Sequence, residues 1–438
     1  MRSVKVLFFA ALVFLFWCRA GEAQGKVYID IDSPAFQRFS IAITDFQKLP
    51  GAAGREDLPA WFSDSIGQYL NMTGLFNVIG KKAFLQDPAR MAAPGGRIEF
   101  ADWTAIGAEY LVRGGHSLAG GSLVVEYRLY DVVKGEMIAG KEYSARADDR
   151  KTIVRKIAED ILLALTGDGS IFGTKIAFVL KKGQNSDIYI VNFDGTGLTQ
   201  VTNFGTTTMS PRWSPDGQSI AFMSYRDGNP DLYVRRLRDY STSKISSFRG
   251  LNLPGAWSPD GRRMLMTLSR DGNEEIYVKD LGGGAPRRLT REFSIDVSPT
   301  WSPDGRKIAF VSNRSGSPQI YVMDQDGKGV RRLTSEGNYN TSPAWSPKGN
   351  RIAYEGRKDG RFQILAVDEN GGNFAALTTE GGQTESPSWS PDGRYVAFSQ
   401  RIGGKSRICV MNANGSNVRV VYESGQGCIS PAWSPRLK

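Results

Sequence analysis

The chain has 438 residues, of which 40% are hydrophobic and 23% are charged, and its formal net charge is +10 at pH 7. This hydrophobic share excludes an intrinsically disordered chain and a protein with many membrane-spanning segments. The basic balance favours acidic partners or anionic surfaces, but it does not by itself indicate a nucleic acid.

The N-terminus has the pattern of a secretory signal peptide. Arg2 and Lys5 precede an apolar run from Val6 to Trp17, and small residues follow as far as Ala23. The run is too short for a comfortable permanent membrane anchor. We therefore expect residues 1–23 to be removed by cleavage after Ala23. A mature chain with 52 basic and 44 acidic residues would remain, soluble and exported, which makes a nucleic-acid partner unexpected.

Three cysteines allow two further expectations. Cys18 follows the bulky Trp17, which argues against a lipoprotein cleavage site. Cys409 and Cys428 would be the cysteines of the mature chain, and the repeat described below places them on neighbouring blades. An oxidising compartment permits a disulfide between them, but two cysteines are not a disulfide framework. A bridge and two free thiols both remain open.

Residues 24–167 predict a small α/β domain. Apolar and polar residues alternate in segments 26–32 and 39–46, and further strand patterns cover 110–118, 122–132 and 136–145. Residues 58–74 predict a helix, as do residues 151–167, where Ile153, Ile157, Ile161 and Leu165 are spaced by four. We expect the glycine-rich stretch 167–173 to be a hinge before the next domain.

Residues 168–438 carry a repeat of 44 residues. Tryptophans recur at this spacing without an insertion, mostly followed by Ser-Pro-Asp-Gly: Trp213, Trp257, Trp301, Trp345, Trp389 and Trp433. Within one period, short β-rich runs such as KIAFVS and IYVMD are separated by turn residues, which gives four strands. Four-stranded units of this length are typical of the blades of a β-propeller. The tryptophans are expected to pack between blades.

The ends of the repeat predict how the ring closes. The IAF-type strand occurs six times, and the Trp strand also occurs six times but one place later. The last copy, SPAWSP at Ser430–Pro435, has no partner except the first IAF strand, at Ile176. We therefore expect a mainly β protein, with an N-terminal α/β domain and a six-bladed propeller closed by its C-terminal strand. Closure removes the open sheet edges, which is compatible with a monomer.

Patterns for catalysis and metal binding are mostly missing. The sequence has no Gly-x-Ser-x-Gly nucleophile elbow, and its single histidine, His116, has no nucleophile pattern beside it. His and Cys do not cluster at zinc-ligand spacing. Segments 192–197 and 324–329 resemble the start of a calcium loop but lack the later glutamate, and they lie where hairpin turns belong. We expect no enzyme activity, no cofactor and no metal.

Two sets of loops are expected to share the face where the innermost strands enter. The first set precedes each Ser-Pro-x-Trp strand and contributes one residue per blade: Thr208, Asn252, Asp296, Asn340, Thr384 and Cys428. The second lies between the IAF and IYV strands and contributes cations: Lys182, Arg226, Arg270, Arg314 and Lys358. A ring of cations would steer an acidic partner. The alternative is a solvated turn residue copied by the repeat, and the sequence leaves both open.

The exported N-terminus, the α/β domain, the six WSPDG-type blades and the closing SPAWSP segment together resemble the TolB family. Its members are the periplasmic component of the Tol–Pal envelope system of Gram-negative bacteria. Tyr28–Pro34 also resembles the start of the mature family chains. The resemblance covers essentially the whole mature chain. It implies a non-enzymatic periplasmic protein that supports outer-membrane integrity and the constriction of the envelope during cell division.

The resemblance also implies partners. The peptidoglycan-associated lipoprotein would bind at the channel mouth, through loops that contain Asn252, Asp296, Ser298 and Asn340. The inner-membrane protein TolA would bind the N-terminal tail, which here comprises Lys26, Val27, Tyr28, Ile29, Asp30, Ile31 and Asp32. Other outer-membrane or periplasmic proteins are further candidates. Leu251 and Ser298 depart from the His or Glu of some relatives, and the tail alternates well enough to join a sheet instead.

A second class of function stays open. An exported propeller that acts on peptides or sugars, as an enzyme or as a ligand-binding protein, would share the repeat. The missing nucleophile, the single histidine and the absent metal cluster count against it.

Overall fold

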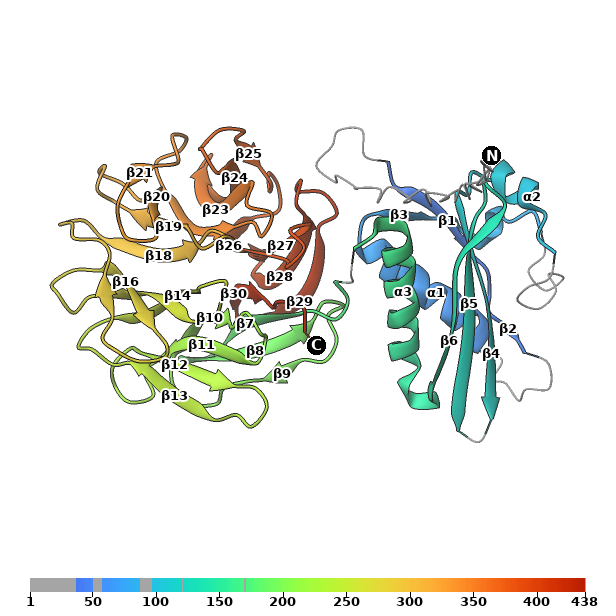
Figure 1. Cartoon of the computed structure of the whole chain (residues 1–438), viewed down its shortest axis with the longest axis horizontal. Helices are drawn as coiled ribbons and strands as arrows, with labels where there is room; N and C mark the ends of the chain where they lie inside the picture. Colours follow the sequence, from blue (N-terminus) through green and yellow to red (C-terminus); the bar gives the residue numbers. More distant parts are fainter. Residues whose placement is uncertain (1–36, 50–56, 87–96, 120, 169–170, 438) are drawn as a thin grey trace, which may run out of the picture.

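The computed structural model describes residues 37–49, 57–86, 97–119, 121–168 and 171–437. It consists of a propeller and a smaller α/β part that lies beside it (Figure 1). The expected fold class is therefore confirmed. The expected signal peptide (1–23) and the tail (26–32) lie outside the described residues.

The α/β part is one twisted sheet with helices on both faces. Its strand order is β3-β1-β4-β5-β6, with β2 paired to β4. Ile41 and Ile43 of β1 point to the face covered by α1 and α3, whereas Ala42 packs with Trp103 of α2 on the other face. The bounds are β1 Phe39–Ile43, β2 Gln47–Lys48, α1 Leu58–Met72, β3 Phe76–Val78, α2 Phe100–Ala105, β4 Tyr110–Ala119, β5 Ser122–Asp131, β6 Glu136–Arg146 and α3 Arg150–Thr166.

The predicted strands within 39–46, 110–118, 122–132 and 136–145 are confirmed, as are both predicted helices. In α3 the four apolar residues spaced by four are all buried, and Gly167 ends the helix with a φ of 67°. The sequence did not predict β2, β3 and α2, which are too short to show a period.

Six four-stranded antiparallel sheets form the propeller (Figure 1). Five blades are continuous in sequence: β10 Thr208–Trp213, β11 Ser219–Ser224, β12 Asp231–Arg236 and β13 Thr242–Ser246; β14 Asn252–Trp257, β15 Arg263–Leu268, β16 Glu275–Asp280 and β17 Arg287–Arg288; β18 Asp296–Trp301, β19 Lys307–Ser312, β20 Gln319–Asp324 and β21 Arg331–Arg332; β22 Asn340–Trp345, β23 Arg351–Lys358, β24 Arg361–Asp368 and β25 Ala375–Ala376; and β26 Gln383–Trp389, β27 Tyr395–Ile402, β28 Lys405–Asn412 and β29 Arg419–Ser424.

The sixth blade joins the two ends of the propeller. Its strand order is β30-β7-β8-β9, formed by β30 Cys428–Trp433, β7 Lys175–Lys182, β8 Asn185–Asn192 and β9 Thr199–Gln200. Trp433 pairs with Ile176 and Cys428 with Leu180. The expected closure by the C-terminal strand is confirmed, and it gives β7 a partner on each side.

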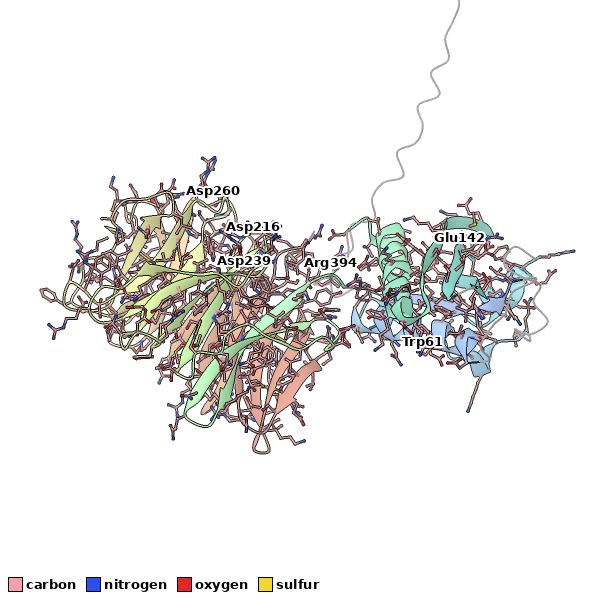
Figure 2. All side chains as sticks on the ribbon, turned by 90° about the horizontal axis from the view of Figure 1, so that it is seen from below. Trp61, Glu142, Asp216, Asp239, Asp260 and Arg394 are labelled. Atoms are coloured by element: carbon pink, nitrogen blue, oxygen red, sulfur yellow. The ribbon has the colours of Figure 1, made fainter. Side chains whose placement is uncertain are left out.

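The repeat residues have the structural roles that their chemistry suggests. Five of the six tryptophans are buried and Trp257 is partly buried. The indole Nε1 of Trp213 donates to the carbonyl oxygen of Ala432 at 3.0 Å, and that of Trp389 donates to the carbonyl oxygen of Ala344, so these two indoles join neighbouring blades. In the turns, the Ser214 hydroxyl donates to Asp216. Asp216 and Asp260 both lie on such turns (Figure 2).

The two parts of the chain share one continuous apolar cluster. Ile171 and Phe172, from the stretch expected to be a hinge, are buried within it. Asp168 accepts ion pairs from Arg394 and Arg436, and Tyr69 of α1 donates to Asp194 of the propeller at 2.7 Å. Arg394 lies on the side of the propeller that faces the α/β part (Figure 2). Ile171 and Phe172 are therefore packed between the two parts, and a hinge at residues 167–173 stays a prediction.

Candidate partner-binding face and channel

One end of the propeller collects the loops in which the sequence located candidate residues. In the blade of β18, Asp296 pairs with Ser312, which in turn pairs with Gln319. This register puts the loop before β18 and the turn between β19 and β20 at the same end. The other blades have the same antiparallel register. We call this end of the propeller the mouth face.

The polar residues expected on this face lie beneath it. Thr208, Asn252, Asp296, Asn340 and Thr384 are all at most 1% exposed. Four of them begin an innermost strand, Thr384 is the second residue of β26, and most of them bond the loops above the strand. The Asn252 amide, for example, donates to the Phe248 carbonyl at 2.7 Å and accepts from the Phe248 backbone N–H. These side chains hold the loops in shape, and their burial removes them from direct contact in this conformation.

Ser298 lies in the wall of the central channel rather than on a loop. It sits in a β-bulge between Val297 and Thr300 and has a φ of 54°, in the left-handed region. Four other blades repeat this conformation, and all five serines line the channel: Ser210, Ser298, Ser342, Ser386 and Ser430. A non-glycine residue with positive φ is uncommon, so its fivefold repetition marks a conformation that the fold imposes.

The expected cations are present on the mouth face, but Arg226, Arg270 and Arg314 are each paired with a carboxylate. The Arg226 guanidinium lies 4.5 Å from the ring centre of Phe204, and Arg270 lies 4.1 Å from that of Phe248. The two arginines pair with Asp227 and Asp271, the next residues in the chain. Stacked and paired cations steer an acidic partner less than a free positive ring would.

Arg314 has a different role from its two counterparts. Its Nη2 donates to Oδ2 of Asp296 at 2.8 Å, and its side chain is only 19% exposed. Burial raises the pKa of Asp296, while the hydrogen bonds from Ser312 and Arg314 and the charge of Arg314 oppose that rise. Arg314 is thus the counter-ion of a buried carboxylate.

The mouth face also presents apolar side chains that sequence reasoning missed. Phe293 is fully exposed on the loop before β18, and Ile295 of the same loop is 44% exposed. Tyr339 lies in the corresponding loop before β22, and Tyr225 follows β11. Exposed aromatic residues beside arginines are characteristic of protein interfaces. The sequence could have indicated these residues through the run REFSID at 291–296, because Phe293 and Ile295 are apolar residues within an expected polar loop.

An acidic pair lies near the channel on two neighbouring blades. Oε2 of Glu355, on β23, accepts a hydrogen bond from the Ser386 backbone N–H at 3.2 Å. Burial and the nearby charge of Glu385 raise the pKa of Glu355 to about 7. Glu385 itself pairs with Arg401. The other blades have Val, Met, Thr or Ser at the register of Glu355, so this carboxylate is a departure from the repeat.

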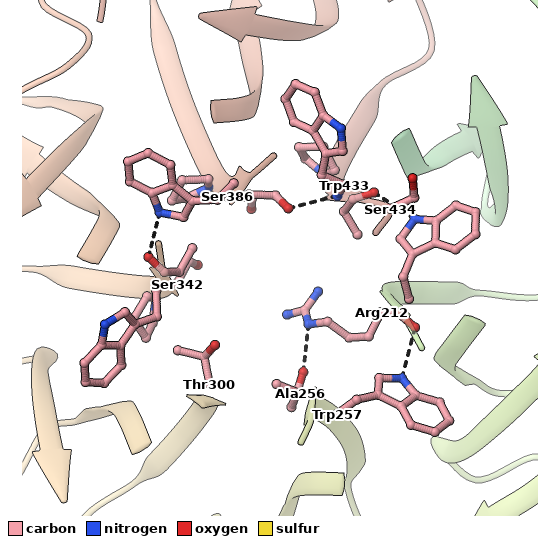
Figure 3. Close-up of a pocket in the computed structure, with 18 of the residues that line it drawn as sticks. Arg212, Ala256, Trp257, Thr300, Ser342, Ser386, Trp433 and Ser434 are labelled. Carbon is pink, nitrogen blue, oxygen red and sulfur yellow. Dashed lines mark hydrogen bonds between the residues drawn. The ribbon is translucent and has the colours of Figure 1, made fainter. Parts of the chain in front are cut away.

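The channel itself is a cavity of about 550 Å³, lined by the Ser-Pro-x-Trp segments of the six blades. Figure 3 shows these segments around the cavity, with Arg212 extending from β10 into it. The tryptophan rings point away from the cavity, while Thr300, Ser342 and Ser386 lie around it.

The chemistry of a catalytic or metal site does not assemble around the other candidates. His116 is buried in β4, where Nδ1 lies 3.0 Å from the Phe46 carbonyl, and burial lowers its pKa. Within the described residues, no group of three or more His, Cys, Asp or Glu side chains is placed to hold a metal. Segments 192–197 and 324–329 form hairpin turns, closed by hydrogen bonds from Asn192 to Thr196 and from Asp324 to Lys328.

The remaining thiols are free. Cys409 and Cys428 are both buried and unbridged. Burial raises the pKa of Cys409 to about 12 and that of Cys428 to about 11. Of the two alternatives that the sequence left open, the structure has the free thiols. Among the helices that the structure describes, none is long and apolar enough to cross a membrane.

Comparison with known families matches both parts of the chain. Residues 163–437 match the model of the TolB beta propeller domain, and residues 27–138 match that of the TolB amino-terminal domain. The chain belongs to the TolB family. The resemblance stated from the sequence is therefore confirmed.

Individual relatives agree with this assignment. The Tol-Pal system protein TolB of Syntrophus aciditrophicus is 53% identical over 198 residues, which cover 44% of each chain. That of Desulfosudis oleivorans is 40% identical over 191 residues, again 44% of each chain. These matches span less than half the length of either curated TolB protein. The crystal structure of TolB from Acinetobacter baumannii has a TM-score of 0.77 at 30% identity, and covers 91% of this chain and 97% of that one.

Proposed function

We propose that this TolB-family chain is a periplasmic, non-enzymatic interaction protein of the Tol–Pal system. It binds the peptidoglycan-associated lipoprotein at the mouth face of the propeller and TolA through the tail at residues 26–32. By linking the two it supports outer-membrane integrity and invagination of the envelope during division. The relatives named as Tol-Pal system proteins support the system, and the signal-peptide pattern at residues 1–23 supports the compartment.

The observation that carries the lipoprotein site is the set of exposed apolar residues on the mouth face. Phe293, Ile295 and Tyr339 lie on the loops before two adjacent innermost strands, β18 and β22. Arg226 and Arg270 present partly exposed guanidinium groups on the turns of two other blades. The buried residues Asn252, Asp296 and Asn340 support these loops from below. A rigid ring that presents aromatic anchors suits a folded partner better than a small substrate.

We also propose the domain boundary at residues 167 and 168. Helix α3 packs on the sheet of the α/β part and ends at Gly167, and the first propeller strand, β7, begins at Lys175.

The test is affinity capture from cell envelopes with the tagged mature chain. The proposal predicts recovery of the peptidoglycan-associated lipoprotein and of TolA. Deletion of residues 24–32 is expected to lose TolA and keep the lipoprotein. Phe293→Ser is expected to do the reverse, whereas Val330→Ser, on a turn at the opposite end of the blades, keeps both. Capture of neither partner by the folded chain would contradict the proposal.

The second class, an exported enzyme or ligand-binding propeller for peptides or sugars, makes a different prediction. The same purified chain would convert or bind such a substrate without any protein partner. Turnover of peptides or oligosaccharides that is retained in Phe293→Ser would favour it.

A further inference from the structure

The channel departs from its repeat at two neighbouring places. One residue before the tryptophan, five blades carry small residues: Ala256, Thr300, Ala344, Ser388 and Ala432. The remaining blade has Arg212 at this register. Five blades also share the Ser-Pro pair three and two residues before the tryptophan. The blade of Trp257 has Pro254 and Gly255 instead.

The two departures contact each other. Nε of Arg212 donates to the carbonyl oxygen of Gly255 at 2.8 Å, and Nη1 donates to the carbonyl oxygen of Pro211 at 2.9 Å. A Cβ on Gly255 would lie 2.6 Å from Cγ of Pro299 and 2.9 Å from the Leu265 carbonyl oxygen, so only glycine fits there. The backbone of one blade therefore fixes the arginine of the next, with its guanidinium in the channel (Figure 3).

This guanidinium has spare hydrogen-bond donors and no counter-ion. Among the described residues that line the channel, Arg212 is the single charged one. Its two hydrogen bonds use two of the five N–H groups of a guanidinium. No ion pair joins it to a carboxylate among the described residues, and burial lowers its pKa. Arg212 is partly buried at the wall of the channel, and a partly buried cation without a counter-ion favours the approach of an anion.

The walls around Arg212 complete a polar site. Thr300, Ser342 and Ser386 lie around the cavity with it (Figure 3). The Ser342 hydroxyl donates to Oε2 of Glu355 at 3.5 Å, whereas the hydroxyls of Thr300 and Ser386 can donate to the remaining oxygens of an anion. The volume of about 550 Å³ lies in the range of sites for small molecules and is too small for a folded domain.

We propose that the channel binds a small ligand with an oxyanion group, a carboxylate or a phosphate, on the guanidinium of Arg212. The planar fork of an arginine matches two oxygens of either group, and the channel hydroxyls hold the rest of the ligand. This site lies inside the propeller, whereas the proposed lipoprotein site lies on the mouth face. The two proposals therefore stand or fall separately.

The experiment is calorimetric titration of the mature chain with succinate and, separately, with inorganic phosphate. Succinamide serves as the neutral probe. One-to-one binding of succinate, phosphate or both is expected, with none of succinamide, and the ligand that binds identifies the chemistry. Arg212→Ala should weaken binding about 10-fold or more, because it removes a charge-assisted pair. Arg262→Ala, at an exposed arginine of a WSPDG turn, should bind like the parent chain.

Arg212→Ala is expected to fold, because three blades already carry alanine at this register. If circular dichroism shows otherwise, Arg212→Lys replaces it. Lysine keeps the charge but loses the fork, so weaker binding is again expected. The proposal is overturned if neither anion binds at about 10 mM. The proposal is also overturned if Arg212→Ala binds the anion as tightly as the parent chain does. The same holds for Arg212→Lys where it replaces the alanine variant.

Discussion

The indole Nε1 of Trp433 donates a hydrogen bond of 2.9 Å to the hydroxyl oxygen of Thr174, which lies 259 residues earlier in the chain. This contact lies beside the pairing of β30 with β7, where the last strand of the chain completes the first blade. The ring of blades is therefore sealed by side-chain and backbone bonds together. Its stability should depend on the last residues of the sequence.

Deletion of residues 430–438 removes most of β30 and leaves β7 as an open edge. The thermal unfolding temperature should fall by roughly 10 °C or more, since burial of Trp433 and a whole strand pairing are lost. Scanning calorimetry measures this, with a chain lacking only Lys438 as the control. An unchanged transition would show that the ring does not depend on its clasp.

Arg314 and Arg270 occupy the same register but should respond differently to truncation. Arg314→Ala leaves the buried carboxylate of Asp296 without its counter-ion, and should lower the free energy of unfolding by about 3–5 kcal/mol. Arg270 pairs with the half-exposed Asp271, so Arg270→Ala should cost about 0–1 kcal/mol. Urea denaturation of the two variants checks the difference. If both variants lost the same free energy of unfolding, the buried pair of Arg314 and Asp296 would stabilise the protein no more than the exposed pair does.

Glu355 should make the stability of the protein depend on pH. Its pKa is raised from 4.5 to about 7 by burial and by Glu385, so the folded state binds its proton more tightly than the unfolded state. The stabilisation is complete below about pH 4.5 and is lost as the pH rises through about 7. Glu355→Gln should therefore gain about 1–3 kcal/mol relative to the parent chain between pH 4 and pH 8.

The control for this prediction is Glu369→Gln, at an exposed carboxylate on another turn. It should follow the parent chain at every pH. Glu385→Gln should reduce the pH dependence in part, because it removes the repelling charge beside Glu355. The measurement is the free energy of unfolding at a series of pH values. The same dependence on pH for the parent chain and for Glu355→Gln would contradict the raised pKa of Glu355.

The buried thiols should be inert in the folded protein. With pKa values of about 12 for Cys409 and about 11 for Cys428, little thiolate forms at pH 8. A thiol reagent such as Ellman's reagent should label neither residue in the native mature chain and both after unfolding in guanidinium. Intact mass should be the same with and without reductant. A mass lower by two hydrogens without reductant would instead show the bridge.

The sequence alone predicted the large features of the fold because they are periodic. The 44-residue spacing of the tryptophans determined the number of blades, and the surplus copy at Trp433 required the clasp. The long helix α3 was predicted from four apolar residues at helical spacing. The strands β2 and β3 have two and three residues, too few to show any period.

The site was less predictable, since a repeat register does not say how deep a side chain lies. Asn252 and Asn340 were expected on the mouth face for their polarity, but each begins a strand and is buried by the loop that it supports. The contact of Arg212 with Gly255 was visible only as two separate departures from the repeat. They meet because adjacent innermost strands lie side by side around the channel.

The central claim is that the mouth face binds the peptidoglycan-associated lipoprotein, and titration of the two purified proteins tests it most directly. Calorimetry should show one-to-one binding that Phe293→Ser weakens by about 10-fold or more, as expected for an interface anchor, while Val330→Ser does not. Absence of binding to the correctly folded chain, or equal affinity for both variants, would contradict the account.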